Sequence, residues 1–494
     1  MLSKMKYMIA VGFLLAAQHS DTIAQTKKWN HCTVRQINLE ADEKAQAITK
    51  FKPPGLHPGS NASITIEVQL NPQQEMDGAG GSFNELGWAA LSALPDKRKK
   101  EVLRNLFDLK AGASLRFNRI PIGASDFAKS AYSLDDTPGD WELKHFSIKR
   151  DENCLIPYIK AAQYFNPKMK FHASPWSPPG WMKSNGKQTG GGELLHDDRT
   201  LQSLANYLVK FLESYRQHGI NVNRLCPQNE PLVAGSYPGC KIPADLYAKA
   251  VRSFIIPAVK KSGLPAEVWA GTFNYWRADT RSHFDGIMKD SEMVKSVKGF
   301  SFQYTNINWL KEFTQKYPQV PFQFSESECY TGKNLKEEVL RDFQDFVAYT
   351  RTGSKLFTFW NMVLPEPHKS TWGWLQNSLV TIDTVKKTVV YQPSYALAKM
   401  IGSQVQPGDH YVTAHITEGE NIIGALNYEP KDAVNFMQTN SIGGEQLVAF
   451  VKKNGNIILL LYNHGDEVQA NIVIGQRKIQ TILPARQLIS LELN

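Results

Sequence analysis

The stretch INVNRLCPQNEP, residues 220–231, runs from a short β-prone segment into a polar loop. Ile220 and Val222 alternate with polar residues and Leu225 follows, a pattern that suits a β-strand. Glu230 comes next, between an asparagine and a proline that prevents a helix from continuing, so a rigid strand presents its carboxyl on a loop. This placement suits a proton donor. A solvated loop glutamate is the alternative for the motif taken alone.

A second stretch, VPFQFSESEC at residues 320–329, repeats this pattern of a β-prone run followed by a carboxylate. It offers two candidates, Glu326 and Glu328, which lie on the same face of an extended chain and are each preceded by serine. Glu326 is favoured because it lies closer to the β-prone run. Two carboxylates at two strand ends suggest a catalytic pair.

Strand-like and helix-like segments alternate through most of the chain, which favours a parallel (β/α)₈ TIM barrel over an open sheet. Eight strand positions fit between residues 78 and 360, and Glu230 then ends the fourth strand and Glu326 the seventh. The glycine-rich turn at 76–85 lacks the glycine and lysine spacing of nucleotide-binding loops, so we expect its glycines to allow close backbone packing at the barrel mouth. The expected strands are 115–122, 169–173, 222–226, 267–270, 299–304, 322–324 and 356–360, and the expected helices are 88–109, 201–218, 244–261, 309–317 and 337–351.

Beyond about residue 400 the pattern changes to short β-prone runs without helices, which predicts a β-sandwich. The alternating segment 64–70 is expected to complete this sandwich from the other end of the chain. The predicted division is a signal peptide at 1–24, an N-terminal sandwich segment at 25–75, a catalytic barrel at 76–398 and a C-terminal sandwich at 399–494. The expected C-terminal strands are 410–416, 422–426, 447–451, 457–462, 470–474 and 488–493.

The N-terminus carries Lys4 and Lys6 before a short apolar stretch, which is typical of a cleaved secretory signal peptide. We therefore expect a secreted protein, periplasmic if bacterial, with no transmembrane segment because no stretch reaches the roughly 20 apolar residues required. The net charge of +9 comes from scattered Lys and Arg residues, so nucleic acid is not an expected partner. A monomer is expected.

The cysteines and other potential metal ligands show no metal-binding spacing, so we expect no metal and no cofactor. Five cysteines leave at least one thiol free. Cys226 and Cys240 bracket the Glu230 loop and are either bridged in an oxidising compartment or two buried thiols.

The expected barrel places Glu230 and Glu326 across its mouth, as in a retaining glycosidase. In such enzymes one carboxyl protonates the leaving oxygen and the other, about 5–5.5 Å away, attacks the anomeric carbon. Arg119 is expected to point inward and meet a carboxylate of the site, because buried guanidinium groups are rare unless paired. Trp176 and Trp360 follow the third and eighth strands, where they either stack on a sugar or fill the core.

Several stretches together resemble glycoside hydrolase family 30, especially its glucosylceramidase and endo-β-1,6-glucanase branches, and the resemblance covers nearly the whole mature chain. It implies a barrel flanked by a β-sandwich and retention of configuration, with Glu230 as acid/base and Glu326 as nucleophile. It also implies that Asn229 donates to the sugar 2-hydroxyl and Tyr304 to the nucleophile. The sugar subsite is expected to include Glu85, Arg119, Trp176, Asn229, Tyr304 and Trp360. The stretches are GGSFNE (80–85), ASPWSPP (173–179), QNEP (228–231), Ser325-Glu326 and Trp360-Asn361.

The resemblance favours a β-glucoside as substrate, either a β-glucan or a glycolipid. A xylan or another β-glycoside of the same family is the alternative substrate. A carbohydrate-binding protein on an inactive barrel is the alternative class of function, and the presence of both glutamates and Asn229 argues against it.

Overall fold

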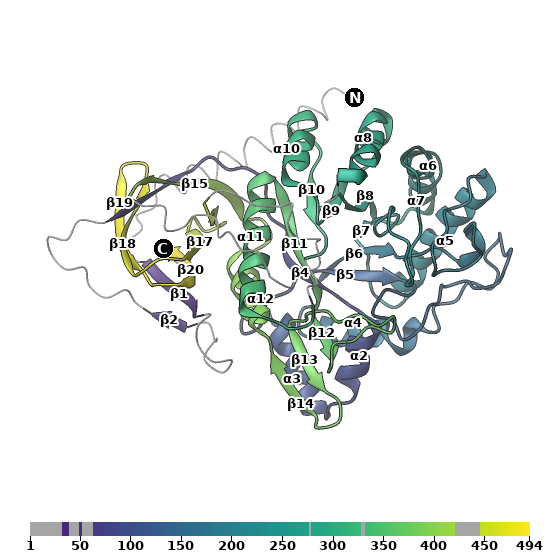
Figure 1. Cartoon of the computed structure of the whole chain (residues 1–494), viewed down its shortest axis with the longest axis horizontal. Coiled ribbons are helices and arrows are strands. Elements are labelled where there is room, and N and C mark those ends of the chain that lie inside the picture. The colour runs from purple at the N-terminus through teal and green to yellow at the C-terminus, as the bar shows by residue number, and fades with distance from the viewer. Residues whose placement is uncertain (1–31, 39–48, 52–62, 276–277, 328–330, 420–444) are drawn as a thin grey trace.

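A computed structural model describes residues 32–38, 49–51, 63–275, 278–327, 331–419 and 445–494 (Figure 1). Eight parallel strands form a closed barrel, as predicted, and helices surround it. Glu230 follows the fourth barrel strand and Glu326 the seventh, which confirms the predicted count. The barrel strands in chain order are β4 (Gly78–Ser82), β5 (Phe117–Ile122), β6 (Lys170–Pro175), β7 (Arg224–Leu225), β8 (Glu267–Asn274), β9 (Gly299–Gln303), β10 (Phe322–Phe324) and β11 (Ser354–Asn361).

The glycine-rich stretch forms the first barrel strand, β4, and not a turn, but the close backbone packing expected of its glycines is confirmed. A Cβ atom on Gly80 would lie 1.7 Å from the carbonyl oxygen of Phe117, and one on Gly81 would lie 2.3 Å from Cγ of Met362. No real side chain tolerates such distances. The glycines therefore let the first strand approach its neighbours closely.

The helices confirm the predicted alternation but differ at proline residues. The expected helix over 88–109 is two helices, and Pro95 stands at the start of the second. The expected helix over 244–261 contains a π-helical segment, Val251–Ile255, just before Pro257, whose nitrogen cannot donate a helical hydrogen bond. The helices are α2 (Glu85–Ser92), α3 (Asp96–Phe107), α4 (Leu155–Gln163), α5 (Asp198–Gln217), α6 (Ala244–Ala250), α7 (Ile256–Ser262), α8 (Arg281–Lys289), α9 (Ser291–Ser296), α10 (Ile307–Lys316), α11 (Lys336–Thr352) and α12 (Pro393–Gln404).

A nine-stranded, mostly antiparallel sheet combines strands from both ends of the chain, as predicted. Strand β15 pairs with β16 through residues 410–412 and with β3 through residues 413–418, so the sheet folds over a single apolar core. Sequence analysis missed β1, β2 and β19, and its expected strand at 422–426 lies outside the described residues. The strands are β1 (Cys32–Asn38), β2 (Thr49–Phe51), β3 (Ile64–Gln69), β15 (His410–Glu418), β16 (Leu447–Val451), β17 (Ile457–Asn463), β18 (Val468–Ile474), β19 (Arg477–Leu483) and β20 (Gln487–Leu493).

A small three-stranded sheet follows the last barrel strand and was not predicted. It consists of β12 (Val363–Pro365), β13 (Val380–Asp383) and β14 (Thr388–Tyr391). Strands β12 and β13 pair in parallel, so the chain between them, residues 366–379, forms a long loop beside the end of the barrel. This loop contributes to the site described below.

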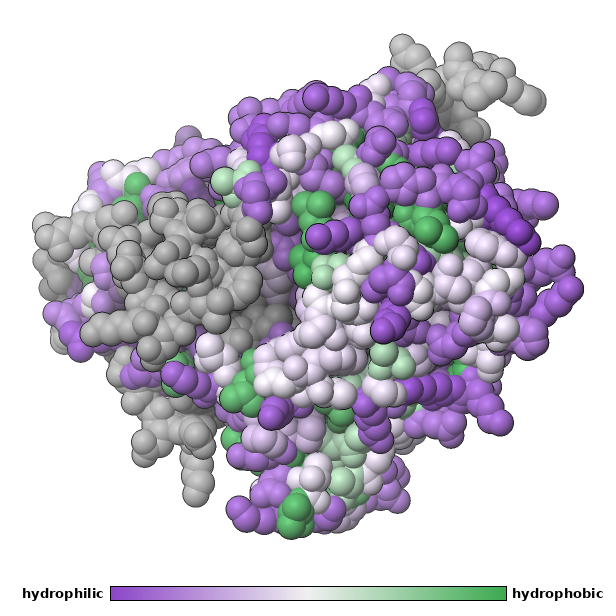
Figure 2. Space-filling model, turned by 45° about the vertical axis from the view of Figure 1, so that its right-hand side comes forward, coloured by the Kyte–Doolittle hydropathy of each residue, from purple (hydrophilic) through white to green (hydrophobic). Residues whose placement is uncertain are grey.

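In the part of the chain that the structure describes, no helix is both long enough and apolar enough to cross a bilayer. On the face shown in Figure 2, strongly apolar residues occur as separate spots among hydrophilic ones.

Candidate active site

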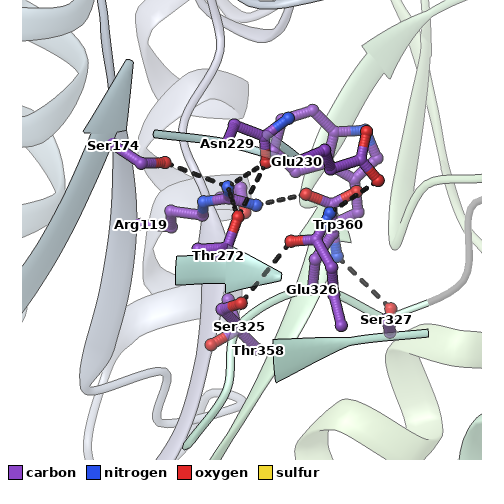
Figure 3. Close-up of polar contacts among 12 residues, drawn as sticks. Arg119, Ser174, Asn229, Glu230, Thr272, Ser325, Glu326, Ser327, Thr358 and Trp360 are labelled. Carbon is purple, nitrogen blue, oxygen red and sulfur yellow. Dashed lines mark hydrogen bonds and ion pairs between the residues drawn. The ribbon is translucent and has the colours of Figure 1, made fainter. Parts of the chain in front are cut away.

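Glu230 and Glu326 lie together at the C-terminal ends of the barrel strands, beside Arg119, Asn229 and Trp360 (Figure 3). Both glutamates are nearly inaccessible, with 9% and 5% of their surface exposed. Because charged groups are rarely buried without partners, the contacts of each carboxyl define what it can do.

Arg119 confirms the prediction of an inward arginine that meets a carboxylate. Its Nη1 donates to Oε2 of Glu326 in a buried ion pair. Its Nη2 donates to Oδ1 of Asn229 at 2.6 Å, to Oγ of Ser174 at 3.0 Å and to Oγ1 of Thr272 at 3.2 Å. One guanidinium group on β5 thus connects residues of β6, β8 and the loops after β7 and β10. It also holds the Glu326 carboxylate in place.

Glu326 meets donors at both of its carboxylate oxygens. Arg119 contacts Oε2, and the hydroxyl of Tyr304 lies 3.0 Å from Oε1 and 2.6 Å from the carbonyl oxygen of Ser327. Burial raises the pKa of Glu326, the charge of Glu230 adds to the rise, and Arg119 and Tyr304 oppose it, so that the pKa lies at about 7. The carboxyl is therefore ionised above about pH 7, and its two donors favour that form.

Glu230 is held differently, because its neutral amide donors converge on a single oxygen. Asn274 and Gln303 donate to its Oε1 at 2.6 and 2.8 Å. Its backbone adopts a φ of +45°, an unusual value for a residue with a Cβ, and its N–H donates to the carbonyl oxygen of Thr272 at 2.9 Å. Burial raises the pKa of Glu230, and the amide donors and Arg119 act against this rise. A raised pKa suits a general acid.

Trp176 and Trp360 form a stacked pair with ring centroids 5.1 Å apart. The guanidinium carbon of Arg119 lies 4.5 Å from the Trp176 ring centroid and 5.5 Å from that of Trp360, within range of a cation–π interaction. Both rings are 2% exposed, and they pack with Phe127 and Leu364. The two tryptophans therefore lie at the site, as expected, and they also stabilise the buried arginine.

Glu85 lies at the first position of α2 and makes its contacts away from the two glutamates. Its Oε2 accepts hydrogen bonds from the backbone N–H of Lys129 and from Arg150, each at 2.8 Å. A direct role for Glu85 toward a sugar stays a prediction. Contacts of the substrate with the other expected site residues also stay predictions; these are Arg119, Trp176, Asn229, Tyr304 and Trp360.

Sequence analysis missed Asp126, a buried carboxyl on the loop that follows β5. Its Oδ1 has no hydrogen-bond partner among the described residues. Burial, with the charges of Glu326 and Glu230, raises its pKa well above the usual range. The same signal that found the glutamates, a carboxylate shortly after a β-prone run, was present in the sequence Ser125-Asp126. Thr272, Asn274 and Gln303 were missed because uncharged residues inside strands carry no such signal.

The cysteines near the site are not bridged. Cys226 and Cys240 are both free and buried, so the alternative of two buried thiols holds, and Sγ of Cys226 lies 3.2 Å from Oγ of Ser301. Glu328 and Cys329 lie outside the described residues. Within the described ranges, no group of three or more His, Cys, Asp or Glu side chains could hold a metal ion.

Comparisons with known proteins identify the family and agree with the fold. The family model of the glycosyl hydrolase family 30 TIM-barrel domain matches residues 76–380. Putative glucosylceramidase 1 of Caenorhabditis elegans is 33% identical over 274 residues, which is 53% of this chain and about half (52%) of that protein's length. Endo-1,6-beta-D-glucanase neg1 of Aspergillus fumigatus is 24% identical over 475 residues, covering 90% of this chain and 96% of that protein. The structure of SrfJ from Salmonella typhimurium superposes with a TM-score of 0.80 at 23% identity, covering 93% of this chain and 99% of that one.

Proposed function

Since the chain belongs to glycoside hydrolase family 30, we propose that it is a secreted retaining glycosidase that hydrolyses β-glucosides. The observation that carries this proposal is the pair of buried carboxyls, Glu230 and Glu326, which follow the fourth and seventh barrel strands and accept hydrogen bonds from different donors, neutral amides for Glu230 and Arg119 with Tyr304 for Glu326. Two carboxyls in unequal environments are what acid/base and nucleophilic roles require.

Glu326 acts as the nucleophile. Arg119 and Tyr304 contact its two oxygens and favour the ionised form, and Arg119 also prevents the carboxylate from rotating away. In the first step an oxygen of Glu326 attacks the anomeric carbon as the bond to the leaving oxygen breaks. In the second step a water molecule attacks the same carbon and Glu326 leaves as a carboxylate.

Glu230 acts as the acid and then as the base. Because Asn274 and Gln303 both donate to Oε1, Oε2 is the oxygen that carries the transferable proton. The proton passes to the leaving oxygen in the first step, and Glu230 takes a proton from the attacking water in the second. The low exposure of the site keeps Glu230 protonated at a pH where a free glutamate would ionise.

Asn229 and Asp126 supply polar groups for the sugar. Arg119 can only donate hydrogen bonds, so the oxygen of the Asn229 amide must face it, and Nδ2 remains as a donor for a sugar hydroxyl. The buried carboxyl of Asp126 has an Oδ1 without a partner among the described residues, and a hydrogen bond between this carboxyl and a sugar hydroxyl would offset its desolvation.

A β-glucoside is the favoured substrate because the relatives carry the names glucosylceramidase and endo-1,6-beta-D-glucanase. A xylan is the runner-up, since solved xylanases of the same family share the fold at 16% identity or less. Secretion rests on the signal-like residues 1–24, and detection of a mature N-terminus near residue 25 on the exported protein would test it.

The experiment that tests the proposal compares Glu326→Gln, Glu230→Ala and Glu328→Gln on an activated aryl β-glucoside and on a β-1,6-linked glucan. Glu326→Gln should abolish cleavage of both substrates. Glu230→Ala should lose far more activity on the glucan, whose leaving group needs a proton, and azide should restore its turnover of the aryl glucoside. Glu328→Gln should remain active, and the exposed Glu213→Gln on α5 serves as a matched control.

Three results would contradict parts of this proposal. An inactive Glu328→Gln with an active Glu326→Gln would move the nucleophile to position 328. Normal activity of both Glu326→Gln and Glu230→Ala would exclude the two-carboxylate mechanism. Cleavage of glucuronoxylan alone would replace the glucoside by a xylan while the mechanism stands.

A further inference from the structure

Three aromatic side chains outside the catalytic centre form a continuous group, which we name the aromatic rim. It consists of Tyr237, on the loop after the fourth barrel strand, and Trp372 and Trp374, on the loop between β12 and β13. The Tyr237 and Trp374 rings meet edge to face with centroids 5.0 Å apart, and the Trp374 and Trp372 rings lie 6.4 Å apart at an angle of 24°. All three side chains are partly exposed.

The aromatic rim is attached to the acid/base residue. Tyr237 lies on the loop that begins at Glu230, lowers the pKa of Glu230, and packs against the cluster that contains Trp176 and Trp360. The loop that carries Trp374 is tied to the same place, because Oε1 of Gln376 accepts a hydrogen bond from Nε1 of Trp360 at 2.9 Å. The rim therefore lies beside the Glu230 loop, whereas Glu326 follows the seventh barrel strand.

This position assigns the rim to one side of the scissile bond. The acid/base residue contacts the leaving oxygen, and the nucleophile contacts the sugar that is retained. Side chains beside the Glu230 loop therefore lie near the leaving group. The rim consequently borders the part of the substrate that departs in the first step.

The rim is held rigidly before any substrate arrives. The buried ammonium group of Lys183 donates to the carbonyl oxygens of Gly239 at 2.6 Å and Gln188 at 3.0 Å, so it fastens the loop at 183–192, which contains Gln188, to the Tyr237 loop. The backbone N–H of Gly190 donates to the carbonyl oxygen of Gly235 at 2.7 Å. The backbone carbonyl of Trp374 accepts a hydrogen bond from Ser370 at 2.8 Å. A platform positioned in advance loses little entropy when it binds.

The chemistry of the rim fits a sugar ring better than an alkyl chain. Trp374 contacts Tyr237 and Trp372 but belongs to no buried apolar cluster of the described residues, so packing of the core does not explain its position. Of the large apolar side chains exposed by more than a third in the described ranges, Leu375 alone belongs to the two loops of the rim. Two lipid chains would need a larger continuous apolar surface. Flat aromatic faces among polar neighbours suit the apolar face of a pyranose.

We propose that Trp374, supported by Tyr237 and Trp372, forms a leaving-group subsite that stacks a pyranose ring of a β-glucan chain. The inference rests on the proposed function and narrows it: the enzyme acts on a substrate whose leaving group is itself a sugar. Trp374 is the specificity-determining residue of this subsite, and Tyr237 positions both the platform and the acid.

The experiment compares Trp374→Ala with wild type on three substrates: a β-1,6-linked gluco-oligosaccharide, dodecyl β-glucoside and β-glucosyl fluoride. The fluoride has no leaving-group ring and needs no protonation, so its hydrolysis reports an intact centre and a folded variant. We expect kcat/KM to fall about tenfold or more on the oligosaccharide and to stay unchanged on the fluoride, as expected for the loss of one aromatic contact. Trp374→Phe should recover most of the loss. Trp309→Ala, which removes a partly buried tryptophan of the outer helix α10, is the matched control.

Three other outcomes would overturn the subsite, its assignment to a sugar, or the proposed function. Equal kcat/KM of wild type and Trp374→Ala on the oligosaccharide overturns the subsite. A loss confined to the dodecyl glucoside overturns the assignment to a sugar in favour of an alkyl leaving group. Wild type that fails to hydrolyse β-glucosyl fluoride overturns the proposed function itself, which separates that failure from failure of the subsite.

Discussion

The replacement Glu326→Gln should change how the stability of the protein depends on pH. Burial raises the pKa of Glu326 from 4.5 to about 7. The folded state then binds a proton more tightly than the unfolded state. The Glu326 carboxyl therefore stabilises the folded state fully below pH 4.5, and this contribution to the unfolding free energy is lost as the pH rises toward and through 7. Since one pKa unit corresponds to about 1.4 kcal/mol, the loss between pH 4 and pH 8 is about 3 kcal/mol.

The assay is urea unfolding at pH 4, 5, 6, 7 and 8, followed by circular dichroism, for wild type and for Glu326→Gln. The informative quantity is the difference in unfolding free energy between the two proteins as a function of pH. The substitution also leaves Arg119 without its carboxylate partner, which lowers the unfolding free energy of the variant. This cost is the same at every pH, so it does not affect how the difference changes with pH. Wild type should lose about 3 kcal/mol relative to the variant across this range, and the exposed Glu213→Gln should show the wild-type dependence.

Two results would refute this reasoning. A difference that does not change with pH would mean that Glu326 is not desolvated in the folded protein. A difference of opposite sign, in which wild type gains stability relative to the variant as the pH rises, would mean that the Arg119 ion pair outweighs burial.

Three further predictions concern other parts of the site and fold. Gln303→Leu removes a donor that lowers the pKa of Glu230, so the high-pH limb of the kcat/KM profile should move to higher pH; an unchanged limb would count against the acid role. Gly80→Ala should destabilise the barrel by about 3 kcal/mol or more, measured by thermal unfolding, because its Cβ would overlap the carbonyl oxygen of Phe117; an unchanged melting temperature would be the contrary result. Dialysis against EDTA should leave full activity, and a loss that zinc or calcium restores, with unchanged melting, would contradict this.

The sequence predicted the framework of the site because its signals are local. Each catalytic candidate is a carboxylate within a few residues of the end of a β-prone run, and the alternation of strands and helices places both runs in one barrel. The inward arginine could also be predicted, since an isolated buried charge is too costly. Strand β4 was assigned to a turn because glycines normally indicate turns. Its glycines instead belong to a strand, where they allow close packing against strands that are distant in the sequence. The amide and hydroxyl groups around Glu230 could not be found, because their role depends on spatial contacts that leave no periodic pattern.

The fourth barrel strand is very short for an element that positions the candidate catalytic residue Glu230. Strand β7 comprises Arg224–Leu225, yet Glu230 lies five residues beyond it. The intervening loop continues to bond with both neighbouring strands: the N–H groups of Cys226 and Asn229 donate to carbonyl oxygens of β6, and those of Gln228 and Glu230 donate to carbonyl oxygens of β8. The loop is therefore an irregular continuation of the barrel wall.

Arg119 completes this arrangement from the barrel interior by contacting the Asn229 side chain in the same loop. The irregular backbone frees Glu230 to adopt its positive φ and turn its carboxyl toward Asn274 and Gln303, while its N–H remains bonded to Thr272. A regular strand would direct side chains alternately to opposite faces and could not place Asn229 and Glu230, neighbours in sequence, in the same site. The short strand thus lets two adjacent residues, the proposed sugar-binding Asn229 and the proposed proton donor Glu230, lie in a single site.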